Sequence, residues 1–423
     1  MKQLFTDRQA RAEAERCLRC FDAPCTSACP ARIDVPGFIA MIGSGNPIGA
    51  AEVVKSANAL ANVCGKVCPE EVFCQEVCTR GKQDAPVAIR ELHFYATQYE
   101  VGRGYSQPRP FKRNGRSVAV IGGGPAGLAC AFELARFGYH IDLYDRSLPG
   151  GVPRNSIPTF RLSEEEVRAD VDFLSRFVEF RQEEVGRERF FGVEESHDAL
   201  FVGVGLAMDR VLPIPGVQLP GVVPVLEFLG SAKRKPGRTP AGKSLVVVGG
   251  GNVSLDAAAT AKRAGYRDVV LLYRRGVREM RVWRGELEEV RNQGVEMQFF
   301  TQPVEIMGPD RVTGIRCRRT RLSDREDSTG RPIPVDIEGS DFTLGADVII
   351  PAIGQIPGAE FLDLFDRTSQ GYLKVDESFA TSRLGVFAGG DLVGGEGTIV
   401  QSVGQGKRAA VGIHRFLSEG AGA

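Results

Sequence analysis

The spacing of apolar residues changes near residue 105 of this chain. Before that point, the stretches "NPIGAAEVVKSANALANV" and "IRELHFYATQYE" have the period of amphipathic helices, and loops that carry cysteines separate them. The stretch that follows, "GRGYSQPRPFKRNGR", is rich in glycine, proline and basic residues and has no apolar period. The pattern therefore predicts a small helical domain over residues 1–105 and a linker over residues 106–116.

Two segments beyond the linker share one pattern of strand, glycine turn, helix and strand. They are "SVAVIGGGPAGLACAFELARFGYHIDLYDR", from Ser117, and "SLVVVGGGNVSLDAAATAKRAGYRDVVLLYRR", from Ser244. Each has the buried strand and glycine turn of a βαβ unit that binds a dinucleotide. The last segment, "LGVFAGGDLVGGEGTIVQSVGQGKRAAVGIHRFL", predicts a strand, a turn and a long helix that return the chain to the first unit.

These patterns predict an α/β fold in which an N-terminal α-helical domain precedes two Rossmann-like nucleotide-binding domains. The second nucleotide-binding domain is inserted into the first. The expected boundaries are residues 117–240 and 346–423 for the two parts of the first domain, and residues 241–345 for the inserted domain.

Composition narrows the class of protein. Among the 423 residues are 53 lysines and arginines and 53 aspartates and glutamates, so we expect no basic field that attracts nucleic acid or an anionic membrane. The N-terminal sequence lacks the apolar core of a signal peptide, and no stretch has the roughly 18 apolar residues of a membrane-spanning helix. We therefore expect a soluble, cytoplasmic protein that has neither nucleic acid nor a membrane as its partner.

Eight of the ten cysteines lie between Cys17 and Cys78. In a reducing cytoplasm such a dense set is more often metal-binding than disulfide-bonded. Two of the runs end in Cys-Pro, which is similar to the ferredoxin pattern. Zinc is the alternative, although zinc sites prefer paired C-x2-C elements and one such pair occurs here. The three runs are Cys17-x2-Cys20-x4-Cys25-x3-Cys29-Pro30, Cys64-x3-Cys68-Pro69 and Cys74-x3-Cys78.

The first repeated segment carries a G-x-G-x-x-G motif formed by Gly122, Gly124 and Gly127, between a buried strand and a helix. Glycines at these positions let the backbone approach a pyrophosphate at the helix N-terminus. Asp145 ends the next strand, where it can accept hydrogen bonds from the hydroxyl groups of an adenosine ribose. The motif therefore predicts a dinucleotide site.

The second repeated segment has Gly249 and Gly251 at the first two glycine positions and a serine at the third. Its second strand is followed by Arg274 and Arg275 instead of an acid. Arginines at that point suit the 2′-phosphate of NADPH, whereas an acid suits a free 2′-hydroxyl. A solvated basic turn is the alternative, because further arginines follow in the same loop.

Longer stretches resemble a known family: "AERCLRCFDAPCTSACPARIDVPGFI", "NALANVCGKVCPEEVFCQEVCTRGKQDAPVAI", "GGVPRNSIPTFRL" and "GGGNVSLDAA" are similar to the FAD- and NAD(P)H-binding part of dihydropyrimidine dehydrogenases. The glutamate synthase small subunit and the large subunit of ferredoxin–NADP transhydrogenase share this plan, within the pyridine nucleotide-disulfide oxidoreductases. The resemblance implies an iron–sulfur flavoprotein that takes a hydride from NADPH or NADH onto FAD and passes single electrons through two 4Fe-4S clusters. Cys130 and Cys317 stand alone, which disfavours disulfide reduction and is typical of small buried residues.

The resemblance also implies the ligands of the two clusters. His93 stands where the relatives have a glutamine or a glutamate, and it would be the fourth ligand of the second cluster. Glu91 or Cys64 completes that site in the alternative interpretations. The implied ligands of the first cluster are Cys17, Cys20, Cys25 and Cys78, and those of the second are Cys29, Cys68, Cys74 and His93.

In the FAD domain, the resemblance implies that Asp391 binds the ribityl chain and that a helix beginning near Thr398 directs its positive end toward the flavin. It assigns no catalytic acid or base. Two positions depart from the relatives and bear on the shape of the nicotinamide pocket, since Ser156 replaces a glycine and Arg281 replaces a proline. The other implied cofactor contacts are Gly151, Arg161, Asn252 and Gly390.

The chain ends once the FAD domain is closed, so we expect the substrate chemistry on another polypeptide. The leading hypothesis is an NAD(P)H-oxidising subunit that feeds an FMN-containing dihydropyrimidine dehydrogenase in a hetero-oligomer. One alternative is the small subunit of glutamate synthase, beside its large catalytic subunit, or a transhydrogenase-type subunit. The non-enzyme alternative is a zinc-stabilised interaction module that carries a structural FAD.

Overall fold

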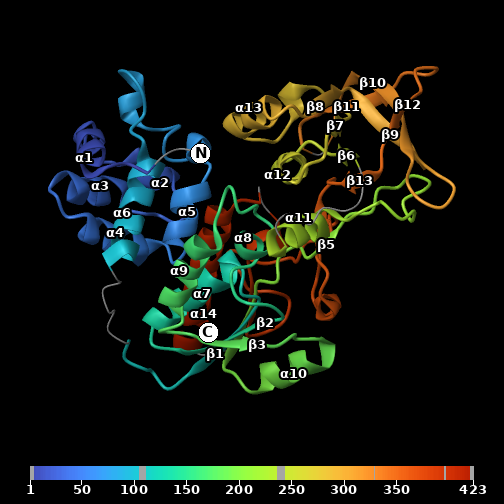
Figure 1. Cartoon of the computed structure of the whole chain (residues 1–423). Helices are drawn as coiled ribbons and strands as arrows, with labels where there is room; N and C mark the ends of the chain where they lie inside the picture. Colours follow the sequence, from blue (N-terminus) through green and yellow to red (C-terminus); the bar gives the residue numbers. More distant parts are fainter. Residues whose placement is uncertain (1–3, 104–110, 236–242, 328, 395–396, 420–423) are drawn as a thin grey trace. The chain divides into compact units, whose positions relative to one another are not determined.

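The structure is a computed structural model that describes residues 4–103, 111–235, 243–327, 329–394 and 397–419. Part of the predicted linker, residues 106–110, lies outside the described residues. The chain divides into two compact units, and the second is an insertion into the first (Figure 1). Unit 1 comprises Met1–Arg154, Thr159–Ala207 and Pro357–Ala423, and unit 2 comprises Asn155–Pro158 and Met208–Ile356.

The N-terminal part of unit 1 is helical, as the sequence predicts. Three of its helices begin at residues whose side chains accept a backbone N–H group, namely Thr6, Asp34 and Asn46. Thr6 also forms a capping box with Gln9. The helices are α1 (Asp7–Glu15), α2 (Pro24–Ala28), α3 (Val35–Gly43), α4 (Pro47–Ala57), α5 (Ala61–Val67) and α6 (Ile89–Arg103), with short 3₁₀ turns η1 (Glu70–Val72) and η2 (Thr79–Lys82).

The first amphipathic stretch of the sequence is broken into two helices, α4 and α5. The break occurs because the side chain of Asn58 accepts a hydrogen bond from the backbone N–H of Leu60, 2.9 Å away, in place of continuing the helix. Cys64 consequently lies inside α5 and is buried, whereas Cys68 follows the end of that helix.

The rest of unit 1 is built on a five-stranded sheet, and each of its pairings is parallel, in the order β15-β4-β1-β2-β3. Two of its central strands, Ser117–Ile121 and Ala199–Val202, are almost wholly apolar and buried, as is typical of strands in a parallel sheet. The C-terminal segment returns to this sheet as predicted, since β15 pairs with β4. The strands are β1 (Ser117–Ile121), β2 (His140–Asp145), β3 (Glu179–Gln182), β4 (Ala199–Val202) and β15 (Val386–Ala388).

Two helices of this domain pack closely against each other. A Cβ at Gly406 of the C-terminal helix would lie 2.1 Å from the carbonyl oxygen of Ala126, so only glycine permits this approach. The helices and turns of the domain are α7 (Pro125–Arg136), α8 (Val152–Asn155), α9 (Glu164–Leu174), α10 (Arg187–Glu195), η4 (Glu360–Leu364), η5 (Gly390–Val393) and α14 (Ile399–Glu419).

Unit 2 contains a four-stranded parallel sheet, in the order β13-β6-β7-β8. The second repeated segment supplies its two central strands, β6 and β7. Its strands are β6 (Ser244–Val248), β7 (Asp268–Tyr273), β8 (Glu296–Phe299) and β13 (Val348–Pro351). Its helices are α11 (Val225–Arg234), α12 (Asn252–Arg263) and α13 (Arg284–Asn292), with the 3₁₀ turn η3 (Val277–Glu279).

Unit 2 also has an antiparallel sheet in which β10 pairs with β9, β11 and β12. The sequence patterns above did not predict this sheet. Its strands are β9 (Thr301–Met307), β10 (Gly314–Glu326), β11 (Pro332–Asp336) and β12 (Phe342–Gly345), and a further pair is β5 (Met208–Asp209) with β14 (Gln355–Ile356).

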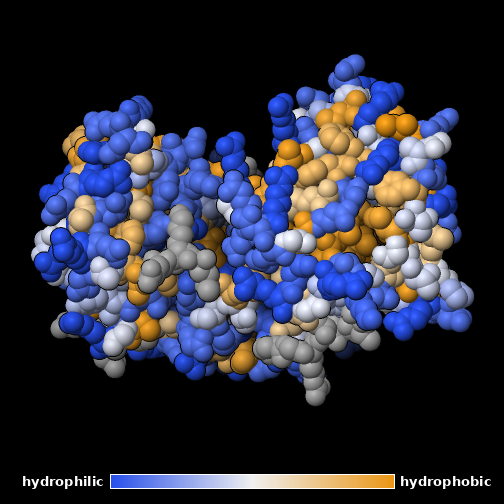
Figure 2. All heavy atoms as spheres, turned by 45° about the horizontal axis from the view of Figure 1, so that its top comes forward, coloured by the Kyte–Doolittle hydropathy of each residue, from blue (hydrophilic) through white to orange (hydrophobic). Residues whose placement is uncertain are grey.

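On the face that Figure 2 shows, hydrophilic residues prevail on the left-hand part, whereas hydrophobic residues gather in a larger area on the right-hand part. Within the described part of the chain, no helix combines the length and the apolar character needed to cross a membrane.

One buried carboxylate joins the helical domain to the sheet domain of unit 1. Asp170 of α9 accepts hydrogen bonds from the backbone N–H groups of Asn62 (3.0 Å) and Val63 (2.9 Å), and from the side-chain amide of Asn62 (2.8 Å). These backbone groups belong to the first turn of α5 and have no acceptor within the helix. The carboxylate also faces the positive end of the helix dipole, so Asp170 fixes the helix that leads to Cys68.

We expect Asp170→Ala to lower the free energy of unfolding by about 3 to 5 kcal/mol, because buried N–H donors lose a charged acceptor. Urea denaturation followed by circular dichroism measures the change. Asp172→Ala, on the exposed side of the same helix, is the matched control and should leave the stability nearly unchanged. Equal stabilities of the two variants would contradict the role of Asp170.

Candidate functional site

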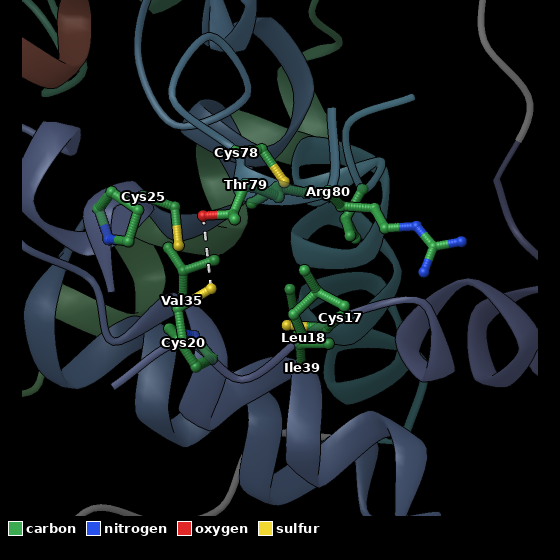
Figure 3. A pocket seen from close by; sticks show the side chains of 13 residues that line it. Cys17, Leu18, Cys20, Cys25, Val35, Ile39, Cys78, Thr79 and Arg80 are labelled. Carbon is green, nitrogen blue, oxygen red and sulfur yellow. Dashed lines mark hydrogen bonds between the residues drawn. The ribbon is translucent and has the colours of Figure 1, made fainter. Parts of the chain in front are cut away.

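Four of the predicted ligands line a single pocket in the helical domain. Cys17, Cys20, Cys25 and Cys78 face this pocket together with apolar side chains that include Val35 (Figure 3). Burial raises the pKa of the Cys25 thiol to about 11, and the neighbouring Cys17 and Cys78 add to the shift. Thiolates can share such a space only if a cation offsets their charge, so the pocket suits a metal centre.

The backbone around this pocket is held in an uncommon conformation. Arg19 and Ala23, on either side of Cys20, have φ angles of 51° and 38°, and Arg32 has 58°. Residues with a side chain avoid this left-handed region, at a cost of about 1–2 kcal/mol each. Strained ligand loops of this kind are typical of a site whose bound group stabilises the loop.

A second group of cysteines surrounds Cys29. Burial raises the pKa of the Cys68 and Cys74 thiols, and the charge of Cys29 raises both further. Cys64 belongs to the same neighbourhood, since burial raises its pKa to about 12 and Cys29 adds to the effect. Glu70, which the sequence patterns did not single out, is also buried here and pairs with Arg90 at 2.9 Å. No spacing signal marks Glu70, because its position depends on the folded loop.

The sulfur atoms are spaced more widely than a single zinc ion requires. Tetrahedral zinc with Zn–S bonds of about 2.3 Å places its sulfurs about 3.8 Å apart. Among the described residues, no three cysteine sulfurs lie within 4.8 Å of one another. The spacing favours a larger inorganic core, such as an iron–sulfur cluster, over mononuclear zinc.

His93 is buried on α6, against the helix that precedes Cys68. Its ring forms a hydrogen bond with the backbone of Ala61, whereas its Nε2 atom has no hydrogen-bond partner. Burial lowers the pKa of His93 to about 4, so the ring is neutral near pH 7. With Nδ1–H bound to the carbonyl of Ala61, the lone pair of Nε2 is available, which is the usual state of a histidine that binds a metal.

The first glycine turn forms the backbone cradle that the sequence predicts. Gly122 has a φ of 108°, and a Cβ at that position would lie 2.5 Å from the carbonyl oxygen of Gly203. At Gly127 a Cβ would lie 1.9 Å from the carbonyl oxygen of Gly122, so the strand and α7 can approach only without side chains. The side towards Gly124 is open, since a Cβ there meets no atom closer than 3.9 Å. This cradle fits the pyrophosphate of a dinucleotide.

Other predicted FAD contacts belong to the same unit. The Asp145 carboxylate accepts the N–H of Gly123 at 2.7 Å and that of Ser147 at 2.8 Å, which fixes it beside the glycine turn. Asp391 is half-buried, desolvation raises the pKa of its carboxyl group, and the carboxylate accepts a hydrogen bond from the hydroxyl of Ser402. Gly151 packs against Gly124, Gly390 donates its N–H to Gln405, and Arg161 is half-buried.

The C-terminal helix begins where the sequence predicts. Thr398 directly precedes α14 and is buried, and its hydroxyl oxygen accepts the N–H of Gln401 at 3.3 Å. The N-terminus of α14 therefore lies close in the chain to Gly390 and Asp391, which precede it in η5. A positive helix end at this point suits a group that gains negative charge, such as a flavin ring.

The second glycine turn has the same character. A Cβ at Gly249 would lie 2.2 Å from the carbonyl oxygen of Ala352, whereas the space at Gly251 is open. Asn252 begins α12, and its side-chain oxygen accepts the N–H of Trp283 at 3.2 Å. Arg281 donates its backbone N–H to the carbonyl of Gly250 at 3.2 Å, a bond that a proline could not make.

The two arginines after β7 differ in their surroundings. Arg275 is buried; its guanidinium pairs with Asp327 at 2.6 Å and donates to the carbonyl of Pro332 at 2.8 Å. Arg274 is exposed, and its backbone carbonyl accepts a hydrogen bond from the hydroxyl of Thr320 at 2.8 Å. The prediction from the sequence assigned both arginines to the 2′-phosphate, but Arg274 is the exposed one of the two.

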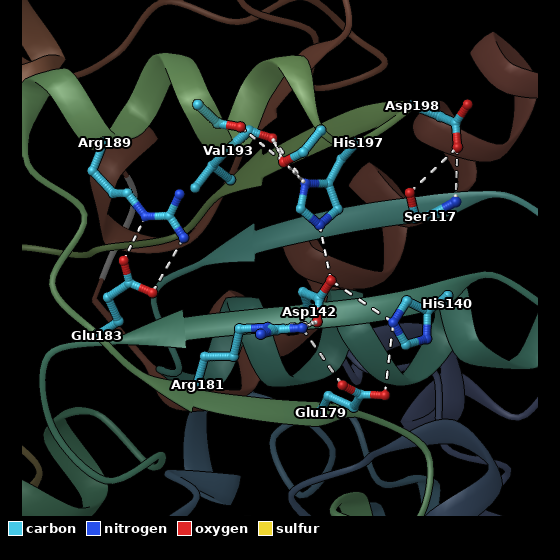
Figure 4. A network of polar contacts seen from close by, with 12 residues as sticks. Ser117, His140, Asp142, Glu179, Arg181, Glu183, Arg189, Val193, His197 and Asp198 are labelled. Carbon is cyan, nitrogen blue, oxygen red and sulfur yellow. Dashed lines mark hydrogen bonds and ion pairs between the residues drawn. The ribbon is translucent and has the colours of Figure 1, made fainter.

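One further cluster of titratable groups lies at the start of β2 and β3 (Figure 4). His140, Asp142 and Glu179 form the one trio of histidine, cysteine or carboxylate ligand atoms within 4.8 Å of one another among the described residues. Arg181, however, pairs with Asp142 at 2.7 Å and with Glu179 at 3.6 Å. Because its guanidinium already neutralises these carboxylates, the cluster is better explained as an ion-pair network that joins β2 to β3.

An iron–sulfur domain joined to two dinucleotide-binding domains defines an iron–sulfur flavin oxidoreductase. Residues 1–105 match the family described as dihydropyrimidine dehydrogenase domain II, 4Fe-4S cluster, and residues 116–406 match the pyridine nucleotide-disulphide oxidoreductases. The chain therefore belongs to the pyridine nucleotide-disulphide oxidoreductase family and carries an N-terminal 4Fe-4S domain.

Curated relatives have similar sequences over most of this chain. It is 34% identical to the NAD-dependent dihydropyrimidine dehydrogenase subunit PreT of Escherichia coli, over 99% of this chain and 96% of that protein. It is 33% identical to the glutamate synthase [NADPH] small chain of the same organism, over 98% of this chain and 92% of that protein. The beta subunit of the NADP(+)-dependent formate dehydrogenase of Moorella thermoacetica is 34% identical over 94% of this chain, which spans 60% of that protein.

Solved structures share the fold of the nucleotide-binding domains. Mycobacterium tuberculosis FprA in complex with NADPH has a TM-score of 0.62 at 19% identity, over 74% of this chain and 85% of that one. Thioredoxin reductase from T. acidophilum has a TM-score of 0.54 at 19% identity, over 71% of this chain and 98% of that one. At this level of identity the likeness shows the fold alone.

We expect Cys20→Ser to lower the iron content of the purified protein, because a serine hydroxyl is a poorer iron ligand than a thiolate at a site built from four cysteines. Iron analysis per flavin, together with the visible absorbance of anaerobically purified protein, measures the loss. Cys317→Ser removes a buried thiol of unit 2 and should keep the full iron content. Equal iron in both variants would remove Cys20 from the ligand set.

Proposed function

We propose that this chain is the electron-input subunit of a cytoplasmic dihydropyrimidine dehydrogenase, which oxidises NAD(P)H and delivers electrons through FAD and two 4Fe-4S clusters to a separate catalytic subunit. The observation that carries the proposal is that the two cysteine groups and the glycine cradle around Gly122 belong to one compact unit. When bound, the flavin accepts a hydride and releases its two electrons singly, and each cluster accepts one electron.

The proposed ligands follow the two cysteine groups. Cys17, Cys20, Cys25 and Cys78 would hold the first cluster, since they line one pocket. Cys29, Cys68 and Cys74 would hold the second with His93, whose unpaired Nε2 supports the choice over Cys64. A neutral imidazole in place of a thiolate would give this second cluster one less negative charge, and hence a higher potential.

The exit of electrons is proposed at the first cluster. Leu18 and Phe21 lie on either side of Cys20, and both are exposed, Phe21 fully. Exposed apolar residues beside a redox centre suit the approach of a partner protein. The similarity to the PreT subunits of dihydropyrimidine dehydrogenase, at 34% identity, supports this choice of partner. The similar glutamate synthase small chains make glutamate synthase the alternative partner.

Isolation of the tagged protein from its native cells, under anaerobic conditions, tests the proposal. The complex should contain an FMN-binding subunit and should reduce uracil with NADPH or NADH. Formation of glutamate from 2-oxoglutarate and glutamine would instead assign the alternative partner. Failure of both nicotinamides to bleach the flavin of the purified chain would contradict the proposed electron entry.

We expect Arg274→Ala to raise the KM for NADPH roughly tenfold to 100-fold and to leave the KM for NADH nearly unchanged. The reason is the loss of a charge-assisted contact with the 2′-phosphate, worth about 1.5–3 kcal/mol. Steady-state kinetics with an artificial acceptor measure both constants. Arg275→Ala is the comparison, since its loss of the buried pair with Asp327 should lower stability more than it changes cofactor preference. Equal losses for NADPH and NADH in Arg274→Ala would overturn the NADPH preference.

We expect His93→Ala to alter the electron paramagnetic resonance signal of one cluster and to leave the other intact, because one ligand of the second cluster is lost. Reductive titration of the anaerobic protein, with spectra at each potential, resolves the two signals. Cys64→Ser is the matched variant on the neighbouring helix. Unchanged spectra in His93→Ala together with iron loss in Cys64→Ser would assign Cys64 as the ligand.

A further inference from the structure

The C-terminal helix α14 contacts the loop that carries Cys29. A Cβ at Gly404 would lie 2.4 Å from the carbonyl oxygen of Pro30, so the loop rests on bare helix backbone with no side chain between. One turn further on, the ammonium group of Lys407 donates a hydrogen bond to the carbonyl of Ala31 at 2.7 Å. The residues directly after Cys29 are therefore seated on α14.

Lys407 contacts two more parts of unit 1 at the same point. Its ammonium group also donates to the carbonyl of Ala57, the last residue of α4, at 2.5 Å. The C-terminal end of a helix carries partial negative charge, which favours a cation there. Glu133 of α7 lies 3.8 Å away, and the neighbouring Arg136 donates to the carbonyl of Ser56 at 2.8 Å. The helix that follows the first glycine turn is thus tied to the same helix end.

The position of Lys407 along α14 links two cofactor sites. The helix begins at Ile399, beside the residues expected to face the flavin. At 1.5 Å per residue, Gly404 lies roughly 9 Å and Lys407 roughly 14 Å along the axis from Thr398. A helix keeps such a separation fixed, whereas a loop does not. The contacts of the Cys29 loop with Gly404 and Lys407 therefore set its distance from the N-terminus of α14.

We propose that Lys407 is a positioning residue that holds the Cys29 loop at a fixed distance from the flavin and whose positive charge raises the reduction potential of the cluster that Cys29 binds. This inference rests on the proposed function, because it uses the assignment of Cys29 to the second cluster. The step affected is the transfer of one electron from reduced flavin to this cluster, in which no bond forms or breaks. Positive charge near a cluster favours its reduced form, which carries one more negative charge.

Lys407→Met tests the proposal in the full-length protein with its flavin and clusters bound. Methionine retains most of the side-chain length but has neither the charge nor the hydrogen-bond donors. Lys407→Arg retains both and is the conservative rescue. Lys262→Met is the matched control, since Lys262 also donates to a carbonyl, that of Arg267, but in unit 2. Gly404→Ala keeps the charge and displaces the loop, so it separates position from charge.

Three measurements distinguish the outcomes: iron per flavin, the midpoint potential of each cluster by electron paramagnetic resonance, and the rate of cluster reduction after rapid mixing with NADPH. We expect Lys407→Met to lower the potential of the second cluster alone and to slow its reduction, with Lys407→Arg and Lys262→Met close to the native protein. Gly404→Ala should slow reduction with a smaller shift of potential. Selective loss of the second cluster in Lys407→Met also supports the positioning role.

An unchanged potential and an unchanged rate in Lys407→Met, with full iron content, would overturn the role of Lys407 and leave the proposed function intact. Absence of iron from the native protein would overturn the proposed function itself. A shift in both clusters to the same extent would also count against Lys407, because a general loss of structure affects both sites.

Discussion

Negative charge on buried sulfur is the constraint on which the N-terminal part of unit 1 depends. Burial and mutual proximity raise the pKa of the thiols of Cys68 and Cys74, so these side chains lose their protons only where a cationic centre replaces them. The same chemistry explains the left-handed backbone at Arg19 and Ala23, because short loops must direct several sulfurs inward at once. In proteins that bind metal through such thiolates, metal binding and folding are coupled.

The two glycine turns depend on a steric constraint, because the backbone at the first glycine of each turn leaves no room for a side chain. At Gly122 and Gly249 a side chain would collide with the backbone just after a neighbouring strand, so the cradle requires glycine regardless of the surrounding sequence. Such positions are visible in the sequence because local sterics determine them. The spacing of apolar residues likewise predicts the strand before each turn and the helix after it. For these reasons, the sequence alone was sufficient to predict both dinucleotide-binding units and the return of the last strand.

Other features depended on contacts between distant residues. The burial of Arg275 depends on Asp327, 52 residues further on, and no local pattern distinguishes it from the exposed Arg274. Likewise, Asp170 caps a helix more than 100 residues earlier in the chain. The antiparallel sheet around β10 was missed because its strands are partly exposed and rich in charged residues, which obscures the apolar period.

The pairing of β15 with β4 has a consequence for biosynthesis. Residues of the first sheet are separated by the whole of unit 2, and the ribosome completes the N-terminal cysteines long before it reaches α14. Until residue 407 has been synthesised, the carbonyl groups of Pro30 and Ala31 have no helix on which to rest. The Cys29 loop therefore gains its support on α14 only after the C-terminal helix has been made. A shortened C-terminus would accordingly remove the support of a loop at the opposite end of the chain.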